Sequence, residues 1–264
     1  MMEIIDIHAH IFPDALAKRA GVSVGTFYEL PPCELGSLHE LLVCERGAGI
    51  SQCVICNVAL SDRQVPSINR FIAQSCQEYP DFLSGFGTMC IDYPDMEAEL
   101  TKMRQEGLLG VKVHPDMQKF LLDSDASIAM CKRIADHGLP MLVHTGDYRY
   151  PYSRPERVAR LLDAVPSLQI ICAHLGGWSI WSDAVSVLAG HDRIWVDTSS
   201  SLYQLSPEEA VAIIRAYGVQ RVLFGTDFPM FQPQMEVERF LALPLNETEK
   251  NAILYKNAKR LLDN

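Results

Sequence analysis

The chain has 264 residues, of which 48% are hydrophobic and 21% are charged, and its formal net charge is −10. A chain of this length is normal for one large α/β domain and can bury a sizeable core. The acidic balance argues against a nucleic-acid-binding protein, which would need a basic patch.

Membrane and secreted proteins are also disfavoured. No apolar run approaches the roughly 18 residues of a membrane span. The apolar N-terminal stretch contains Glu3 and Asp6 and has no basic region before it, unlike a signal peptide. The eight cysteines are scattered through mostly apolar segments, and on a strand Cys53 and Cys56 would point to opposite faces. We therefore expect a cytoplasmic protein with reduced, buried thiols.

In chain order, apolar runs rich in β-branched residues alternate with helical patterns. The apolar runs predict eight strands, at residues 3–10, 50–60, 82–89, 108–115, 140–146, 169–177, 194–200 and 222–229. Helices are predicted between or after them at 37–49, 123–138, 206–218 and 246–262, with capping boxes that begin at Ser206 and Asn246. Such nearly continuous apolar strands favour a parallel sheet covered on both faces.

Eight strands and about eight helices, in one domain over residues 1–264, match a (β/α)8 barrel in number and size. An open doubly wound sheet is the alternative. It would usually have fewer strands and a glycine-rich phosphate turn after the first strand, where this chain has His8-Ala9-His10.

Polar side chains gather where the predicted strands end, which is the edge at which barrels of this kind carry their active sites. These residues are His8 and His10 on the first strand, Lys112 and His114 on the fourth, His144 on the fifth, His174 on the sixth and Asp227 on the eighth. The three other histidines, His39, His137 and His191, fall in helices or at helix ends. Five of the eight histidines therefore lie at the edge where a site is expected.

His8 and His10 are two residues apart, so both point to the same face of a strand and can share one divalent cation. His144 and Asp227 would complete a set of three nitrogens and one oxygen. The alternative is a group of core histidines that bond to backbone carbonyls. His174 is the expected general base, and its competing role is ligand to a second metal. The glycines that follow it would let the backbone approach a ligand closely.

Lys112 has three possible roles: a carbamate that bridges two metals, an ammonium that contacts substrate, or a structural ion pair. The loop after the fifth strand offers Arg149, Tyr152 and Arg154 as substrate contacts, and an arginine there could clamp a carboxylate. The alternative for these residues is ion pairing between the loop and a helix. Further candidates are His114 as a substrate contact, Trp178 as a pocket wall, Phe12 as a lid over the metal, and Asp197 and Ser199 as hydrogen-bond partners behind the site.

Several stretches together resemble the amidohydrolase superfamily. They are DIHAH at 6–10, HTG at 144–146, AHLGG at 173–177, VDTSS at 196–200, FGTDFP at 224–229 and NAKRLL at 257–262. The likeness is greatest to the branch that includes aminocarboxymuconate-semialdehyde decarboxylase, γ-resorcylate decarboxylase and pyrone-dicarboxylate lactonase. It implies a distorted (β/α)8 barrel with a divalent metal, commonly zinc.

The same resemblance implies that His8, His10, His144 and Asp227 hold the metal. It also implies that His174 is the base or a ligand to a second metal, with Lys112 at the position of the bridging lysine in members with two metals. Dimers are common in the family, so a homodimer is a possible assembly.

The resulting hypothesis is a metal-dependent hydrolase, in which metal-activated water attacks the amide, lactone or ester carbonyl of a small organic substrate and His174 or Asp227 handles the proton. The alternative is a metal-dependent, non-oxidative decarboxylase. A non-enzymatic binding barrel is the third hypothesis. We expect one zinc ion, or two, and no nucleic-acid or membrane partner.

Overall fold

Eight parallel strands form one sheet in the computed structural model, and the strand order follows the chain from β1 to β8. The structure describes residues 2–31 and 33–263. The strands are β1 (Ile5–His10), β2 (Gln52–Cys56), β3 (Leu83–Thr88), β4 (Gly110–Val113), β5 (Met141–Val143), β6 (Ile170–Cys172), β7 (Ile194–Asp197) and β8 (Val222–Leu223). The sheet nearly closes on itself, because Ile7 N donates to Phe224 O at 2.9 Å and His10 N donates to Phe228 O at 2.7 Å. The predicted (β/α)8 barrel is confirmed, and the open sheet is excluded.

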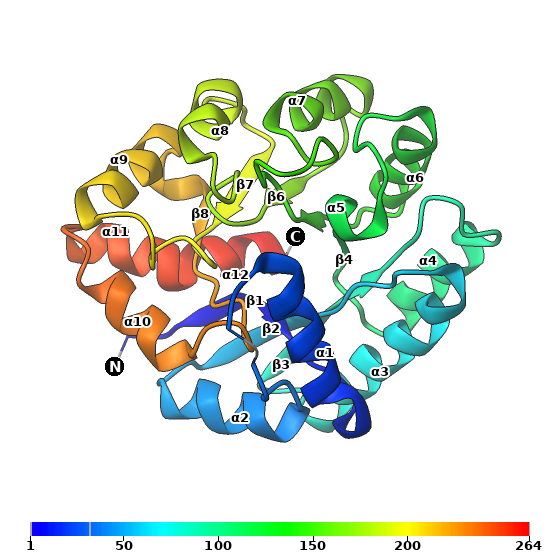
Figure 1. The fold of residues 1–264 in the computed structure, drawn as a ribbon, viewed down its shortest axis with the longest axis horizontal. Coiled ribbons are helices and arrows are strands. Elements are labelled where there is room, and N and C mark those ends of the chain that lie inside the picture. Colours follow the sequence, from blue (N-terminus) through cyan, green and yellow to red (C-terminus); the bar gives the residue numbers. More distant parts are fainter. Residues whose placement is uncertain (1, 32, 264) are drawn as a thin grey trace.

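Helices surround the barrel (Figure 1). They are α1 (Asp14–Tyr28), α2 (Leu38–Gly47), α3 (Val65–Glu78), α4 (Met96–Gln105), α5 (Pro115–Gln118), α6 (Asp125–Asp136), α7 (Pro155–Ala164), α8 (Trp181–Leu188), α9 (Pro207–Tyr217), α10 (Pro233–Leu241), α11 (Glu247–Asn251) and α12 (Asn257–Leu262). The capping boxes predicted at Ser206 and Asn246 are present, and Ser37 forms a third. A π-helical turn at Ala252–Lys256 divides the last predicted helix into α11 and α12.

Two apolar cores hold the barrel together. One fills the barrel interior with buried side chains that include Ile5, Val54, Phe86, Leu142 and Trp195, and the larger one lies between the strands and the helices. The interior core has little spare room, since a Cβ atom on Gly110 would lie 2.9 Å from three carbons of the Phe86 ring. Apolar packing therefore fills the interior of the barrel and leaves the carboxyl ends of the strands for polar groups.

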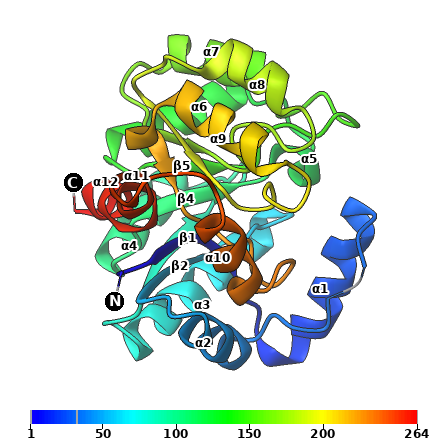
Figure 2. The same cartoon turned by 90° about the vertical axis from the view of Figure 1, so that its left-hand side faces the viewer.

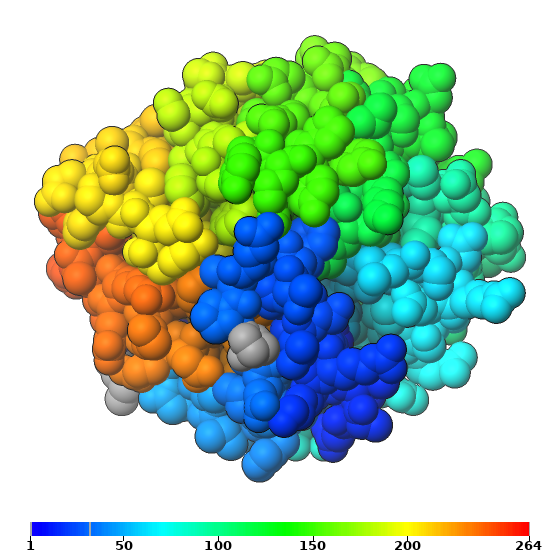
Figure 3. Space-filling model, in the orientation of Figure 1, coloured from blue at the N-terminus to red at the C-terminus, as the bar shows by residue number. Residues whose placement is uncertain are grey.

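Helix α1 was not predicted, and it lies over the carboxyl ends of the strands (Figures 2 and 3). Its buried residues are all small, namely Ala17, Gly21 and Gly25. A Cβ atom on Gly21 would lie 2.3 Å from the carbonyl oxygen of Cys33, so the helix backbone packs directly against the returning chain. The sequence signal was weak because this helix has no apolar face of the usual width.

All eight cysteines are free, as predicted. The prediction that they are buried holds for four of them, Cys53, Cys56, Cys131 and Cys172, whereas Cys33, Cys44, Cys76 and Cys90 are half-buried. Within residues 2–31 and 33–263, no helix is both long enough and apolar enough to cross a bilayer.

Candidate metal centre and active-site cavity

The first and eighth strands bring His8, His10 and Asp227 together, as the sequence predicted. The Nε2 atoms of His8 and His10 lie 3.1 Å apart. Asp227 Oδ1 lies 3.6 Å from His8 Nε2 and 3.4 Å from His10 Nε2. Two imidazole nitrogens and one carboxylate oxygen therefore face one another across a space that a single cation could bridge.

The outer nitrogens of the two imidazoles have their own partners. His8 Nδ1 lies 3.0 Å from Asp197 Oδ2 and 3.0 Å from Ser199 Oγ, which are the supporting contacts expected of these residues. His10 Nδ1 lies 3.7 Å from Cys56 Sγ. Metal-binding histidines usually have their second nitrogen fixed in this way, because the outer partner sets the tautomer and the orientation of the ring.

His144 and His174 form a second pair of facing ring nitrogens. His144 Nδ1 lies 3.0 Å from His174 Nε2, and Ser199 holds the other nitrogen of His174 at 2.9 Å. His144 also contacts Tyr28 and Asp116, and its ring stacks on that of His114 with the centroids 4.0 Å apart. The predicted four-ligand set thus appears as two adjacent groups, which are linked where the rings of His8 and His174 stack at 5.4 Å.

Lys112 lies in β4 with its amine against the first group. Its side chain is buried, and Nζ lies 2.9 Å from His8 Nε2. Burial lowers the pKa of Lys112, and burial together with the Lys112 charge lowers the pKa of His8 to about 4. Both changes favour neutral nitrogens with free lone pairs, the state in which a nitrogen can face a cation.

The carboxylates beside these nitrogens remain ionised. Burial acts to raise the pKa of Asp227, but His8 and His10 hold it well below its ordinary value. Burial likewise acts against the Asp197 carboxylate, but His8 lowers its pKa to about 2. Burial acts to lower the pKa of His10, but Cys56 and Asp227 raise it to about 9. The raised pKa of His10 shows that the group attracts positive charge, which either a proton on His10 or a divalent metal ion held by these nitrogen and oxygen atoms can supply.

Two residues of the site adopt backbone conformations that are costly for non-glycine residues. His174 has φ 61° and Asp227 has φ 63°, both in the left-handed region. Such strain persists only where the surrounding structure enforces it, and it is concentrated at functional sites. The glycines after His174 serve packing rather than ligand approach, which corrects the sequence interpretation. A Cβ atom on Gly176 would lie 2.3 Å from the Tyr217 hydroxyl oxygen.

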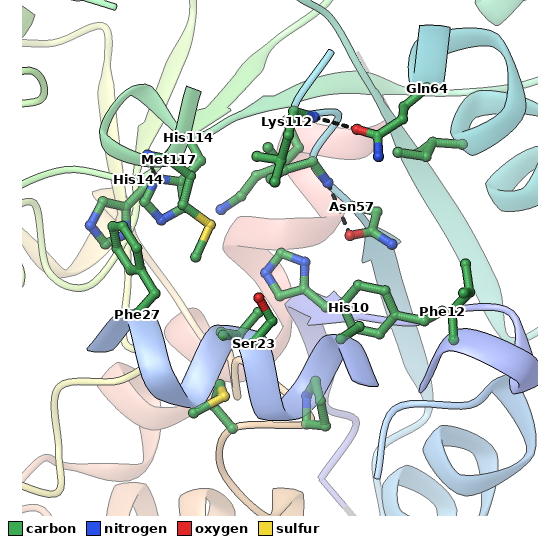
Figure 4. A pocket seen from close by; sticks show the side chains of 18 of the residues that line it. His10, Phe12, Ser23, Phe27, Asn57, Gln64, Lys112, His114, Met117 and His144 are labelled. Carbon is green, nitrogen blue, oxygen red and sulfur yellow. Dashed lines mark hydrogen bonds between the residues drawn. The ribbon is translucent and has the colours of Figure 1, made fainter. Parts of the chain in front are cut away.

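A cavity of about 660 Å³ opens from this polar group toward α1 and α3 (Figure 4). Its polar end contains His8, His10, Lys112, His114, Asp116, His144, His174 and Asp227. Its remaining wall is mostly apolar and includes Phe12, Leu16, Val24, Phe27, Leu60, Ile68 and Phe71. Phe12 thus lies in the wall of the cavity, close to the position expected of it. Trp178 lines a small adjoining recess together with Tyr28 and His174.

Arg149 does not offer its guanidinium to the cavity, and this revises its role as a candidate carboxylate clamp. It forms a two-pronged ion pair with Asp147, with N–O distances of 2.9 and 2.7 Å, and it donates to the carbonyl oxygen of Phe27 at 2.8 Å. Arg154 likewise donates to carbonyl groups within its own loop. Neither arginine lines the described cavity, and Tyr152 does not line it either. These side chains fix the loop and the end of α1.

Tyr28 and Asp116 are site residues that the sequence did not indicate. The Tyr28 hydroxyl lies 3.1 Å from His144 Nδ1 and hydrogen bonds with His114 Nε2. Asp116 Oδ2 lies 3.7 Å from His144 Nε2, a buried nitrogen without a hydrogen-bond partner. Asp116 directly follows His114-Pro115 at a strand end, a position that could have identified it. Tyr28 belongs to the unexpected helix and had no such signal.

Comparison with known proteins agrees with this architecture. A family model described as Amidohydrolase matches residues 57–263, which begin directly after β2. The chain is similar to a crystal structure of 2,6-dihydroxybenzoate decarboxylase in complex with 2,6-dihydroxybenzoate. The match covers 100% of both chains, with 19% sequence identity and a TM-score of 0.76.

Two further solved structures are similar over 100% of this chain. A dihydroxybenzoic acid decarboxylase from Polaromonas sp. with bound manganese has 16% identity, 97% of that chain covered and a TM-score of 0.75. A putative 2-pyrone-4,6-dicarboxylic acid hydrolase from Pseudomonas putida has 24% identity, 98% of that chain covered and a TM-score of 0.70. No curated protein sequence matches the chain. At these identities the structural matches establish the fold.

Proposed function

The chain belongs to the amidohydrolase family, and on this basis we propose that it is a metal-dependent, non-oxidative decarboxylase of an apolar carboxylic acid. In this reaction the bond between the carboxyl carbon and the rest of the substrate breaks. The electron pair stays on the organic fragment, which takes up a proton, and carbon dioxide leaves without addition of water.

One observation carries this proposal, namely the division of the cavity into a polar end and an apolar remainder. A carboxylate that enters such a cavity leaves bulk water and meets charge only at the polar end. Loss of carbon dioxide converts this poorly hydrated anion into a neutral product, so a dry wall beside the polar end favours the reaction, and a metal held there would supply the positive charge that binds the carboxylate. Among the similar solved structures, two of those described above are decarboxylases, which supports the same choice.

His174 is suited to deliver the proton. Ser199 holds its Nδ1 at 2.9 Å, while its Nε2 is turned toward His144. Burial lowers the pKa of His174, so the ring gives up a proton readily once it has received one. Asp227 is the second candidate for this role. His114 and Lys112 line the polar end and would hold the substrate oxygens.

His8, His10 and Asp227 would hold the metal, with His144, His174 and Lys112 available to complete the first site or to form a second. When bound there, a divalent metal would supply a Lewis acid that fixes the substrate oxygens and polarises the carbonyl group. Zinc remains our specific expectation, although three of the similar decarboxylase structures contain manganese. Both ions accept nitrogen and oxygen ligands.

Hydrolysis is the second candidate function, and the family description together with the 24% identical putative hydrolase favours it. In that case His174 or Asp227 would take a proton from the attacking water rather than give one to carbon.

The test is incubation of the metal-loaded protein with aromatic carboxylic acids, lactones and amides in heavy water and in ¹⁸O-labelled water. A decarboxylase releases carbon dioxide and incorporates one deuterium at the carbon that lost it. Incorporation of ¹⁸O into an organic product would instead identify a hydrolase. His174→Ala should abolish turnover, whereas His137→Ala, at the C-cap of α6, should not change it.

A further inference from the structure

We propose that the substrate carries an extended apolar group of about ten carbons, alkyl or aryl, which lies between α1 and α3 while its carboxylate lies at the polar end of the cavity. This inference rests on the proposed function, since it specifies the substrate class of the same site. It concerns the apolar part of the cavity, which lies beyond the groups that would bind the metal and transfer the proton.

We call the part of the cavity between α1 and α3 the apolar arm. Two facing walls define it. Helix α1 supplies Leu16, Val24 and Phe27, and the segment from β2 through α3 supplies Leu60, Ile68 and Phe71. Figure 4 shows α1 running along the cavity, with Phe27 beside His114 and His144 and with Phe12 beside His10. The walls therefore offer a mostly apolar surface beside the catalytic groups, with Ser23, Gln64 and Ser67 as polar residues within it.

The volume of the cavity is larger than a small aromatic acid needs. At roughly 30 Å³ for a water-sized group, a cavity of about 660 Å³ has space for about twenty such groups. A benzoate-sized acid would leave most of the apolar arm in contact with water. A carboxylate with a ten-carbon tail would cover both walls.

Two large apolar side chains of the cavity wall are exposed to solvent. Leu16 is 51% exposed and Leu60 is 60% exposed, and both line the cavity. An apolar tail that passes between them would remove this surface from water, which is the main source of affinity for such groups.

The exposed charges around the cavity favour the approach of an anionic ligand. The acidic residues that line the cavity are Asp116 and Asp227, and both belong to the polar end. The other charged residues in its wall, apart from the imidazoles and Lys112, are Arg19 and Lys119, which are exposed. Exposed cations beside an apolar channel attract a carboxylate and do not hold an apolar tail.

The test is calorimetric binding of straight-chain carboxylates from butanoate to dodecanoate to the metal-loaded protein. Each added methylene up to about ten carbons should raise the affinity at least twofold, with about fourfold as the upper limit for complete burial. Binding should have a stoichiometry of one per chain. An affinity that does not change with chain length would overturn the proposal.

A pair of variants separates binding in the arm from general adsorption of apolar chains. Ser23→Trp fills the arm from an exposed position on α1, and Ser182→Trp places the same side chain at an exposed position of α8 outside the cavity. Ser23→Trp should weaken decanoate binding at least tenfold and leave butanoate binding within twofold. Ser182→Trp should change neither, and equal effects of the two variants would contradict the proposal.

These binding measurements do not depend on turnover. If affinity rises with chain length but no carbon dioxide is released from any acid, substrate binding in the apolar arm is supported and the proposed reaction is wrong. If carbon dioxide is released but neither affinity nor kcat/KM depends on chain length, the proposed reaction is supported and the proposal that the substrate fills the apolar arm is wrong.

Discussion

Replacing Asp197 with asparagine should uncouple His8 from metal binding while the barrel stays folded. Asp197 Oδ1 accepts from His174 N at 3.1 Å and from Ser199 N at 3.0 Å, and an asparagine oxygen can keep both bonds. Its amide nitrogen would then face His8 Nδ1, where Oδ2 now lies at 3.0 Å. The asparagine amide nitrogen can only donate a hydrogen bond, so His8 Nδ1 would have to accept it. The His8 ring would then carry its proton on Nε2.

Nε2 is the nitrogen that faces His10, so a proton there blocks the proposed metal ligand. Loss of such an outer partner typically weakens metal binding by roughly 10- to 100-fold. Stability should change as well. The fall in the pKa of Asp197 from 3.8 to about 2 corresponds to about 2.5 kcal/mol at about 1.4 kcal/mol per tenfold change in proton affinity. Since the folded pKa is depressed, this contribution is present above pH 3.8 and is lost as the pH falls toward 2.

Metal affinity is measured by titration against a competing chelator, and stability by urea unfolding of the metal-free protein at pH 7 and pH 3. Asp197→Asn should lose metal affinity and should be about 2.5 kcal/mol less stable at pH 7, with a smaller deficit at pH 3. Asp192→Asn, at an exposed carboxylate nearby, is the matched control. Metal binding by Asp197→Asn within twofold of the unmodified chain would refute the reasoning.

Three further outcomes are expected. Removal of the metal by a chelator should abolish turnover and lower the free energy of unfolding by about 2.7 kcal/mol relative to protein with metal at 100 times its Kd, and added metal should restore both. Arg149→Met should speed trypsin cleavage at Lys18 and Arg19 by about tenfold, because the end of α1 loses a charged hydrogen bond to the Phe27 carbonyl. The control Arg70→Met, at an exposed arginine of α3, should leave the cleavage rate at these two sites unchanged. Burial raises the pKa of Glu236 from 4.5 to about 7, so the stability of the unmodified protein should fall as the pH rises through this interval. Urea unfolding should show a shift of about 3 kcal/mol in favour of Glu236→Gln between pH 4.5 and 8, and parallel pH profiles would contradict the expectation.

The barrel could be predicted because its strands carry a local signal. Runs such as residues 50–60 and 169–177 are rich in apolar residues, several of them β-branched, and each contains a strand. The spacing of His8 and His10 was equally informative, since two residues on one strand place two rings on one face. These inferences needed only neighbouring residues along the chain.

Contacts made by loops could not be predicted in the same way. Arg149 looked free to bind a substrate carboxylate, but Asp147, two residues earlier, occupies it. Whether an arginine in a loop faces its own neighbour or the cavity depends on backbone angles that the sequence does not reveal, such as φ 70° at Asp147. Tyr28 was missed for a related reason, because it reaches His144 only through the placement of a whole helix.

The way α1 is attached has a consequence for how this protein can change over evolutionary time. Its buried packing face consists of Ala17, Gly21 and Gly25, while the residues that line the cavity lie on a separate stripe of the same helix. Substitutions at Leu16, Ala20 or Val24 can therefore alter which molecules bind in the cavity without disturbing this packing face. The cavity-facing stripe of α1 is in this sense exchangeable for selectivity, whereas Tyr28 of the same helix contacts His114 and His144 and belongs to the site.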